Sequence, residues 1–243
     1  MCMNDKLTKV NSKHSNNFTT TDNMTSLSPN VLDSILNLLE IVESKDWQTF
    51  EKVALSNPKF FRTLCKAIAG CEEFHGMTLL HAVVRHDPPL NIVAKIIDIC
   101  PRLLNDTDCL GRTALHVAAG MGASSSLIYL IAHSCPSSCI AQDEDGKTPL
   151  HFACDSSCEL FEDSSSSSLS RSSIPDHESI RDLLSVSIHA ATMEDVDEMN
   201  PLEYAILSDS GLKTVKLLQN AAVKTQRSRS KSPVRKTCYN CAA

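Results

Sequence analysis

One six-residue pattern recurs in this sequence at a fixed interval of 35 residues. It reads Gly-Met-Thr-Leu-Leu-His from Gly76, Gly-Arg-Thr-Ala-Leu-His from Gly111 and Gly-Lys-Thr-Pro-Leu-His from Gly146. Self-similarity at such a period is typical of proteins built from short units that cannot bury their apolar faces alone. The chain is therefore expected to fold as a stack of similar units.

A fourth, degenerate copy of the pattern begins at Glu198, 52 residues after Gly146 instead of 35. The excess of 17 residues is matched by residues 155–175, which contain ten serines and show no apolar periodicity. Insertions in repeat proteins usually fall in loops of single units. We expect these residues to form a flexible loop between the two helices of the third unit.

Each copy carries the residues that end a turn and start a helix. Glycine supplies the positive φ of a tight turn, and threonine two residues later is a good helix N-cap. The turn glycines are Gly76, Gly111 and Gly146, and the capping threonines are Thr78, Thr113 and Thr148. In the fourth copy Asn200 is the expected cap, Pro201 the first helical residue and Glu203 the partner in a capping box.

After each cap, the sequence predicts a short helix of small and apolar residues and then a second, longer helix. The expected apolar stripes of the second helices are Leu90, Val93 and Ile97; Leu127, Leu130 and Ile131; Ile180, Leu183 and Leu184; and Leu212, Val215 and Leu218. The pattern predicts helix pairs that stack side by side, and hence an all-α fold.

The N-terminal part of the chain divides at Ser28. Residues 1–27 are polar and lack periodicity, so we expect them to be disordered. Residues 28–73 predict three amphipathic helices that cover the first repeat. The first has Ser28 and Pro29 as cap and first residue, the second begins at Asp46, and the third begins after Asn57 and ends at Gly70. Their expected apolar stripes are Leu32, Ile35, Leu36 and Leu39; Trp47, Phe50 and Ala54; and Phe61, Leu64, Cys65 and Ile68.

The motif GxTPLHxA, followed by a helix pair at a period near 33, resembles the ankyrin repeat. The resemblance covers about residues 74–220 and implies an ankyrin-repeat solenoid of helix-turn-helix units with an N-terminal helical cap. The expected repeat domain is 74–223, with repeats near 76–110, 111–145, 146–197 and 198–220. The departures are the longer period, Glu198 in place of glycine and Glu203 in place of histidine.

The resemblance also implies a function, which is protein binding without catalysis. It places recognition at the turn tips and on the exposed side of each first helix. The expected binding residues are His75, Met77, Arg85, His86, Leu110, Arg112, Gly120, Met121, Asp145, Lys147, Asp155 and Ser156. It further implies that His81, His116 and His151 make local hydrogen bonds that brace the helix start and the neighbouring turn.

Motifs for other chemistry are weak, and we expect no catalytic residue, metal or cofactor. The spacing of Cys135, Cys139, His151 and Cys154 resembles a zinc site, but the histidine and Cys154 already have repeat positions. Cys238 and Cys241 form a lone CxxC without a second pair. Apolar runs are far shorter than the roughly 20 residues of a membrane span, and the scattered cysteines favour a reducing compartment. We therefore expect a monomer in the cytoplasm or nucleus.

The segment 224–243 is basic, whereas residues 143–198 are strongly acidic. Six Lys and Arg residues fall within 224–236, and we expect a disordered tail. Ser228, Ser230 and Ser232 are candidate phosphorylation sites, because phosphate on all three would nearly cancel the positive charge. An alternative function is a nuclear regulatory factor whose tail contacts nucleic acid while the repeats recruit a protein.

Overall fold

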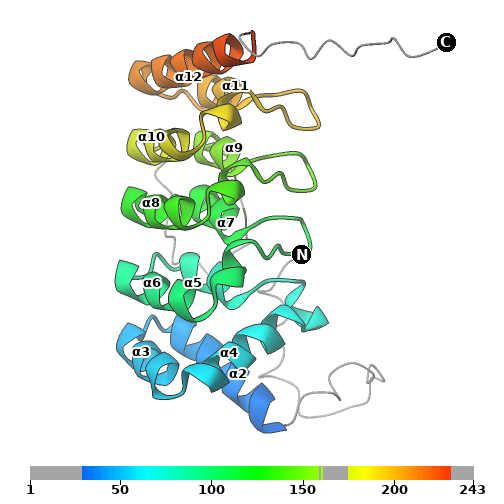
Figure 1. Cartoon of the computed structure of the whole chain (residues 1–243), viewed down its shortest axis with the longest axis vertical. Coiled ribbons are helices and arrows are strands. Elements are labelled where there is room, and N and C mark those ends of the chain that lie inside the picture. The colour runs from blue at the N-terminus through cyan, green and yellow to red at the C-terminus, as the bar shows by residue number, and fades with distance from the viewer. Residues whose placement is uncertain (1–28, 159, 161–174, 231–243) are drawn as a thin grey trace, which may run out of the picture.

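The computed structural model describes residues 29–158, 160 and 175–230. Within these ranges the chain is helical, and its only extended pairing is an isolated bridge between Thr107 and Thr113. Figure 1 shows a stack of helix pairs with a three-helix group at one end. The predicted all-α solenoid is confirmed.

The N-terminal cap consists of α2 (Pro29–Glu43), α3 (Trp47–Ser56) and α4 (Pro58–Ala69). The side chains of Asp46 and Asn57 accept hydrogen bonds from the backbone of Thr49 and Phe60, so both predicted caps are present. The α4 stripe is buried as predicted, but the stripe of α2 is rotated. Its buried residues are Ile35, Leu38, Leu39 and Val42, whereas Leu36 is exposed.

The repeats are four pairs of a short inner and a longer outer helix. The pairs are α5 (Leu79–Val84) with α6 (Leu90–Ile99), α7 (Ala114–Gly120) with α8 (Ser125–Ser134), α9 (Pro149–Cys154) with α10 (His177–Val186), and α11 (Pro201–Leu207) with α12 (Leu212–Ser230). The inner helices pack on one another in sequence order, as do the outer helices. The expected insertion falls between α9 and α10, and most of it lies outside the described residues.

Short 3-10 helices connect each unit to the next, which the sequence pattern did not predict. They are η2 (Glu72–Phe74), η3 (Pro101–Leu104), η4 (Pro136–Ile140) and η5 (Ile188–Thr192). Each is followed by a loop that projects from the stack on the side of the inner helices (Figure 1). These loops lead directly to the inner-helix caps.

The outer helices are buried along a stripe that differs in part from the expected one. In α10 the stripe of Ile180, Leu183 and Leu184 is confirmed. In α6, however, Ile92, Val93 and Ile96 are buried while Leu90 is exposed. Leu90 and Leu212 are the first residues of their helices. In α12, Leu212 is 67% exposed, and the buried stripe consists of Thr214, Leu218, Ala221 and Thr225.

The last helix is longer than expected, because α12 runs to Ser230. The hydroxyl of Thr225 is buried and donates to the carbonyl of Ile188 at 3.1 Å, which fixes this part of α12 against η5. The expectation that disorder begins at residue 224 is therefore wrong for 224–230, which form helix. Residues 231–243, including Ser232, Cys238 and Cys241, lie outside the described residues, as do residues 1–28.

Candidate functional site

The loops between units form four fingers, which we define as residues 72–78, 107–113, 142–148 and 194–200. Fingers 2 to 4 have an aspartate as their second residue: Asp108, Asp143 and Asp195. In each, one carboxylate oxygen accepts hydrogen bonds from the backbone N–H groups two and four residues later, at 2.7 to 3.1 Å. The aspartate thus closes the finger into a fixed loop.

The turn at each finger tip requires a left-handed residue. Gly76, Gly111 and Gly146 have φ of 74°, 74° and 77°, as predicted for the turn glycines. In finger 4 Glu198 occupies the equivalent position and takes φ of 61°. A left-handed conformation costs a residue with a Cβ about 1–2 kcal/mol. Finger 4 therefore keeps the loop geometry with a strained backbone at Glu198.

Backbone hydrogen bonds connect each finger to the one before it. The N–H of Cys109 donates to the carbonyl of His75 at 2.7 Å, and that of Glu144 donates to Leu110 at 3.0 Å. The N–H of Val196 donates to Asp145 at 2.9 Å. The four fingers therefore form one continuous edge along the stack (Figure 1).

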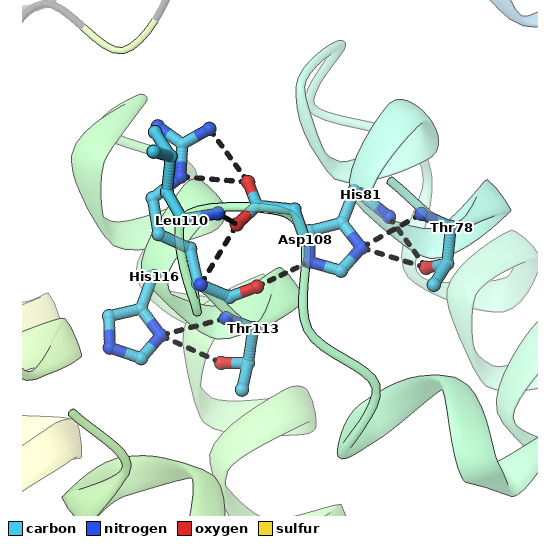
Figure 2. Close-up of polar contacts among 7 residues, drawn as sticks. Thr78, His81, Asp108, Leu110, Thr113 and His116 are labelled. Atoms are coloured by element: carbon cyan, nitrogen blue, oxygen red, sulfur yellow. Dashed lines mark hydrogen bonds and ion pairs between the residues drawn. The ribbon is translucent and has the colours of Figure 1, made fainter. Parts of the chain in front are cut away.

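The recurring Thr-His pair ties each inner helix to the next finger. In the first pair, Nδ1 of His81 accepts the backbone N–H of Thr78 at 3.2 Å and lies 2.8 Å from its hydroxyl. Because Nδ1 accepts, the ring proton is on Nε2, which donates to the carbonyl of Arg112 at 2.8 Å (Figure 2). These bonds brace the start of the inner helix and connect it to the next finger.

The next two repeats use the same arrangement. Nε2 of His116 is 3.1 Å from the carbonyls of Ala141 and Lys147, and Nε2 of His151 is 3.1 Å from that of Met199. Burial lowers the pKa of all three histidines, and that of His116 falls to about 4. They are neutral at physiological pH and serve as structural bridges, with both ring nitrogens occupied.

The fourth repeat keeps the helix-start geometry with different residues. Its Glu203 accepts the backbone N–H of the Asn200 cap at 2.7 Å, which completes the predicted capping box. Tyr204 connects α11 to its own finger and not to a following one, because its hydroxyl donates to Asp195 at 2.6 Å. The Nζ of Lys147 lies 5.0 Å from the centre of the Tyr204 ring, a cation–π contact between finger 3 and α11.

Nine of the twelve expected binding residues have accessible side chains. Leu110 and Asp145 are exposed. The partly exposed residues are His75, Arg85, His86, Met121, Lys147, Asp155 and Ser156. These positions lie at the finger tips and just after the inner helices, so they share one side of the stack.

Met77, Arg112 and Gly120 are buried, which corrects their expected place on the surface. Met77 is 2% exposed and lines a small cavity beside α2. Arg112 is 4% exposed, and its guanidinium binds the carboxylate of Asp108 at 2.7 and 2.8 Å (Figure 2). Gly120 lies under Leu160, which an added Cβ would overlap.

Other accessible residues were missed because binding positions were assigned only in the first three copies of the pattern. Val196 at the tip of finger 4 is 66% exposed, and Asp197 beside it is also exposed. On α11, Ile206 and Leu207 are exposed apolar residues. Aligning the fourth motif with the third would have placed Asp197 opposite Asp145 and assigned it to the tip.

The residues of the zinc-like spacing have other contacts. His151 uses both nitrogens as described, and Cys154 is fully buried in α9. The thiol of Cys135 donates to the side-chain oxygen of Asn105 at 3.1 Å. Across the described ranges, no three His, Cys, Asp or Glu side chains are grouped to hold a metal ion, and none of the described helices is long and apolar enough to cross a membrane.

Comparison with known proteins identifies the same kind of repeat that the helix pairs and fingers indicate. Residues 80–162 match the family model "Ankyrin repeats (3 copies)". No curated protein matches the chain. The match ends before the fourth helix pair, whose finger, cap and inner helix nevertheless repeat the geometry of the first three. The chain thus carries an ankyrin-repeat domain.

Proposed function

We propose that this chain is a non-enzymatic scaffold that binds a protein segment along its fingers. Ankyrin repeats are generally protein–protein interaction modules. The observation that carries the proposal is a row of accessible tips on a hydrogen-bonded edge. Such an edge is already ordered before binding, so a partner does not bear the entropy cost of fixing it.

The chemistry of the tips indicates the class of partner. We define the acidic finger surface as Leu110, Glu144, Asp145, Val196, Asp197 and Glu198, all of which are exposed. Two apolar side chains, Leu110 and Val196, alternate along it with four carboxylates. Across the described ranges none of these four carboxylates forms an ion pair. We therefore propose that the partner presents Lys or Arg side chains next to apolar ones.

The test uses fluorescence anisotropy with two peptides of equal length, one alternating Lys and Leu and the other alternating Glu and Leu. The full chain should bind the cationic peptide, with an affinity that falls as salt is raised. Reversing two charges with Glu144→Lys and Asp197→Lys should weaken binding by about 2- to 30-fold, because each lost exposed pair costs about 0.2–1 kcal/mol.

The matched control is Asp33→Lys with Glu40→Lys, which makes the same charge change on exposed residues of α2. This variant should bind the cationic peptide as the unmodified chain does. Equal affinity for both peptides, or equal loss in both variants, would contradict the proposed surface. Capture from native cell extract with the same baits would then identify the partner that depends on the fingers.

A second proposal concerns the basic segment and its serines. Lys224 and Arg227 are exposed on the last turns of α12, and the nucleic-acid alternative predicts that they contact phosphate. The test is salt-dependent binding of random-sequence DNA or RNA. Deletion must begin at residue 231, with Lys224→Gln and Arg227→Gln added, because removing Thr225 would also remove the contact with η5. Nucleic-acid binding that survives these changes would contradict the proposal that the basic segment contacts phosphate.

We also propose that phosphorylation of Ser228, Ser230 and Ser232 regulates this segment. Ser228 lies in the last turn of α12 and its hydroxyl donates to the carbonyl of Thr225 at 2.7 Å. A phosphate there removes that donor and adds negative charge at the negative end of the helix dipole. Ser228→Glu should therefore lower helix content at the end of α12, measured by hydrogen exchange, whereas Ser228→Ala should not.

A further inference from the structure

A cavity lies where the cap meets the first repeat. It has a volume of about 940 Å³ and is formed by α4, the end of α6, η3 and the adjoining finger loops. Two cysteines, three cations and two aspartates are among the residues that line it: Cys65, Cys100, Arg62, Lys66, Arg102, Asp98 and Asp106. A cleft that combines thiols with positive charge is a setting in which cysteine becomes reactive.

The two thiols are far apart in sequence but adjacent in space. Cys65 is in the middle of α4 and Cys100 is the C-cap residue of α6. Both line the same cavity, and each thiol shifts the pKa of the other. Cys65 is fully buried, whereas Cys100 keeps 7% exposure at the wall of the cavity. A small oxidant entering the cavity would thus meet Cys100 first.

The surroundings favour a negative charge on Cys100. Nε of Arg62 donates to the carbonyl of Ile99 at 3.0 Å, which holds the guanidinium beside the next residue. The neighbouring Cys65 thiol, Arg62 and Lys66 lower the pKa of the Cys100 thiol, whereas the Cys100 sulfur and burial raise the pKa of the Cys65 thiol. One sulfur is therefore suited to attack as a thiolate and the other to remain a thiol.

We propose that Cys100 and Cys65 are a hydroperoxide-reactive pair that closes into a disulfide between the cap and the first repeat. The Cys100 thiolate attacks one peroxide oxygen, the O–O bond breaks, and hydroxide leaves, so that cysteine sulfenic acid forms. The Cys65 thiol then attacks that sulfur and loses its proton, and the sulfenic hydroxyl leaves as water. In sum, two thiols and one hydrogen peroxide give one disulfide and two waters.

The equivalent cysteine of the next repeat has a different environment. Cys135 is also the C-cap of an outer helix, 35 residues after Cys100. Its thiol hydrogen-bonds to Asn105 and lies 3.2 Å from the hydroxyl of Ser137. Close by, burial raises the pKa of Cys139 to about 12. We therefore expect Cys100 to be oxidised before Cys135, and Cys135→Ser is the matched control.

The experiment is oxidation of the reduced full-length chain with hydrogen peroxide, followed by alkylation, trypsin digestion and mass spectrometry. The expected product is a disulfide between peptides 63–66 and 96–102 that forms before other cysteines react. Cys65→Ser should accumulate sulfenic acid at Cys100, trapped with dimedone, and Cys135→Ser should form the cross-link at the unmodified rate. Circular dichroism of each variant verifies that it is folded.

Arg62→Gln tests the role of charge and not only that of proximity. We expect it to slow oxidation of Cys100 about tenfold near neutral pH and to move the pH profile of the rate upward. The proposal is overturned if the unmodified chain forms no 63–66 to 96–102 cross-link, or if Cys135 or the exposed Cys109 is oxidised as fast as Cys100. It is equally overturned if Arg62→Gln leaves the pH profile unchanged.

Discussion

Acid should destabilise this domain through its buried histidines, and the size of the loss can be calculated for His116. Its pKa is about 4 in the folded chain because it is buried, against about 6.5 in an unfolded chain. The unfolded state therefore binds the proton more readily. The contribution to stability is complete above pH 6.5 and is lost as the pH falls from 6.5 towards 4. At pH about 4.5, linkage gives a loss of about 2.5 kcal/mol from this residue alone.

The assay is urea unfolding followed by far-UV circular dichroism at pH about 7.5 and about 4.5. His116→Gln should be less stable than the unmodified chain at the higher pH, because it cannot reproduce both hydrogen bonds of the ring. At the lower pH the difference between the two should shrink by about 2.5 kcal/mol, and acid effects on carboxylates cancel in that difference. His133→Gln, on an exposed residue of α8, should show no such change. Parallel pH dependence of His116→Gln and the unmodified chain would refute the reasoning.

Three further predictions concern stability, each measured as the free energy of unfolding in urea. Gly146→Ala should lower the free energy of unfolding by about 1–3 kcal/mol, because φ is 77° there and the added Cβ would lie 3.1 Å from backbone atoms of finger 4. Gly211→Ala, where an added Cβ has nothing within 4 Å, should be near neutral. Equal losses in the two variants would contradict the steric argument. Glu198→Gly should stabilise the chain by up to about 1 kcal/mol, because it relieves the left-handed strain at φ of 61°, and a loss of stability would speak against strain there. Met77→Ala should lower the free energy of unfolding by about 2–5 kcal/mol, whereas Leu110→Ala, at a residue 40% exposed, should change it by less than about 0.5 kcal/mol. A larger loss from Leu110→Ala than from Met77→Ala would contradict the burial of Met77.

Most of the repeat could be predicted because its determinants are local. A turn glycine, a threonine cap and a proline in the first turn act within a few residues of one another, so Gly146, Thr148 and Pro149 indicate a helix start without knowledge of the fold. The interval of 35 residues then indicates stacking. The fourth repeat was found for the same reason, since Asn200 and Glu203 form a capping box by themselves.

The errors arose where a neighbour outside the local pattern decides the outcome. Arg112 is at a tip position by its distance from the turn glycine, but Asp108, four residues earlier, binds its guanidinium and buries it. Met77 is adjacent to Gly76 and is nevertheless covered by α2. Residues 224–230 have a charged composition typical of a tail, yet Thr225 has an acceptor on η5, 37 residues away. The approach of Cys100 to Cys65 depends on how α4 packs on the first repeat, which the sequence pattern does not specify.

The residues that hold a finger are distinct from those that a partner would meet. The aspartates bond within their own fingers and the histidines bond to the next finger, and finger 4 keeps its loop with Glu198 in place of the turn glycine. The tip side chains make none of these bonds. Carboxylates at Glu144, Asp145 and Asp197 are exposed and form no ion pair within the described part of the chain. A cationic partner would supply the opposite charge, and this is the physical reason for proposing that the tips serve binding.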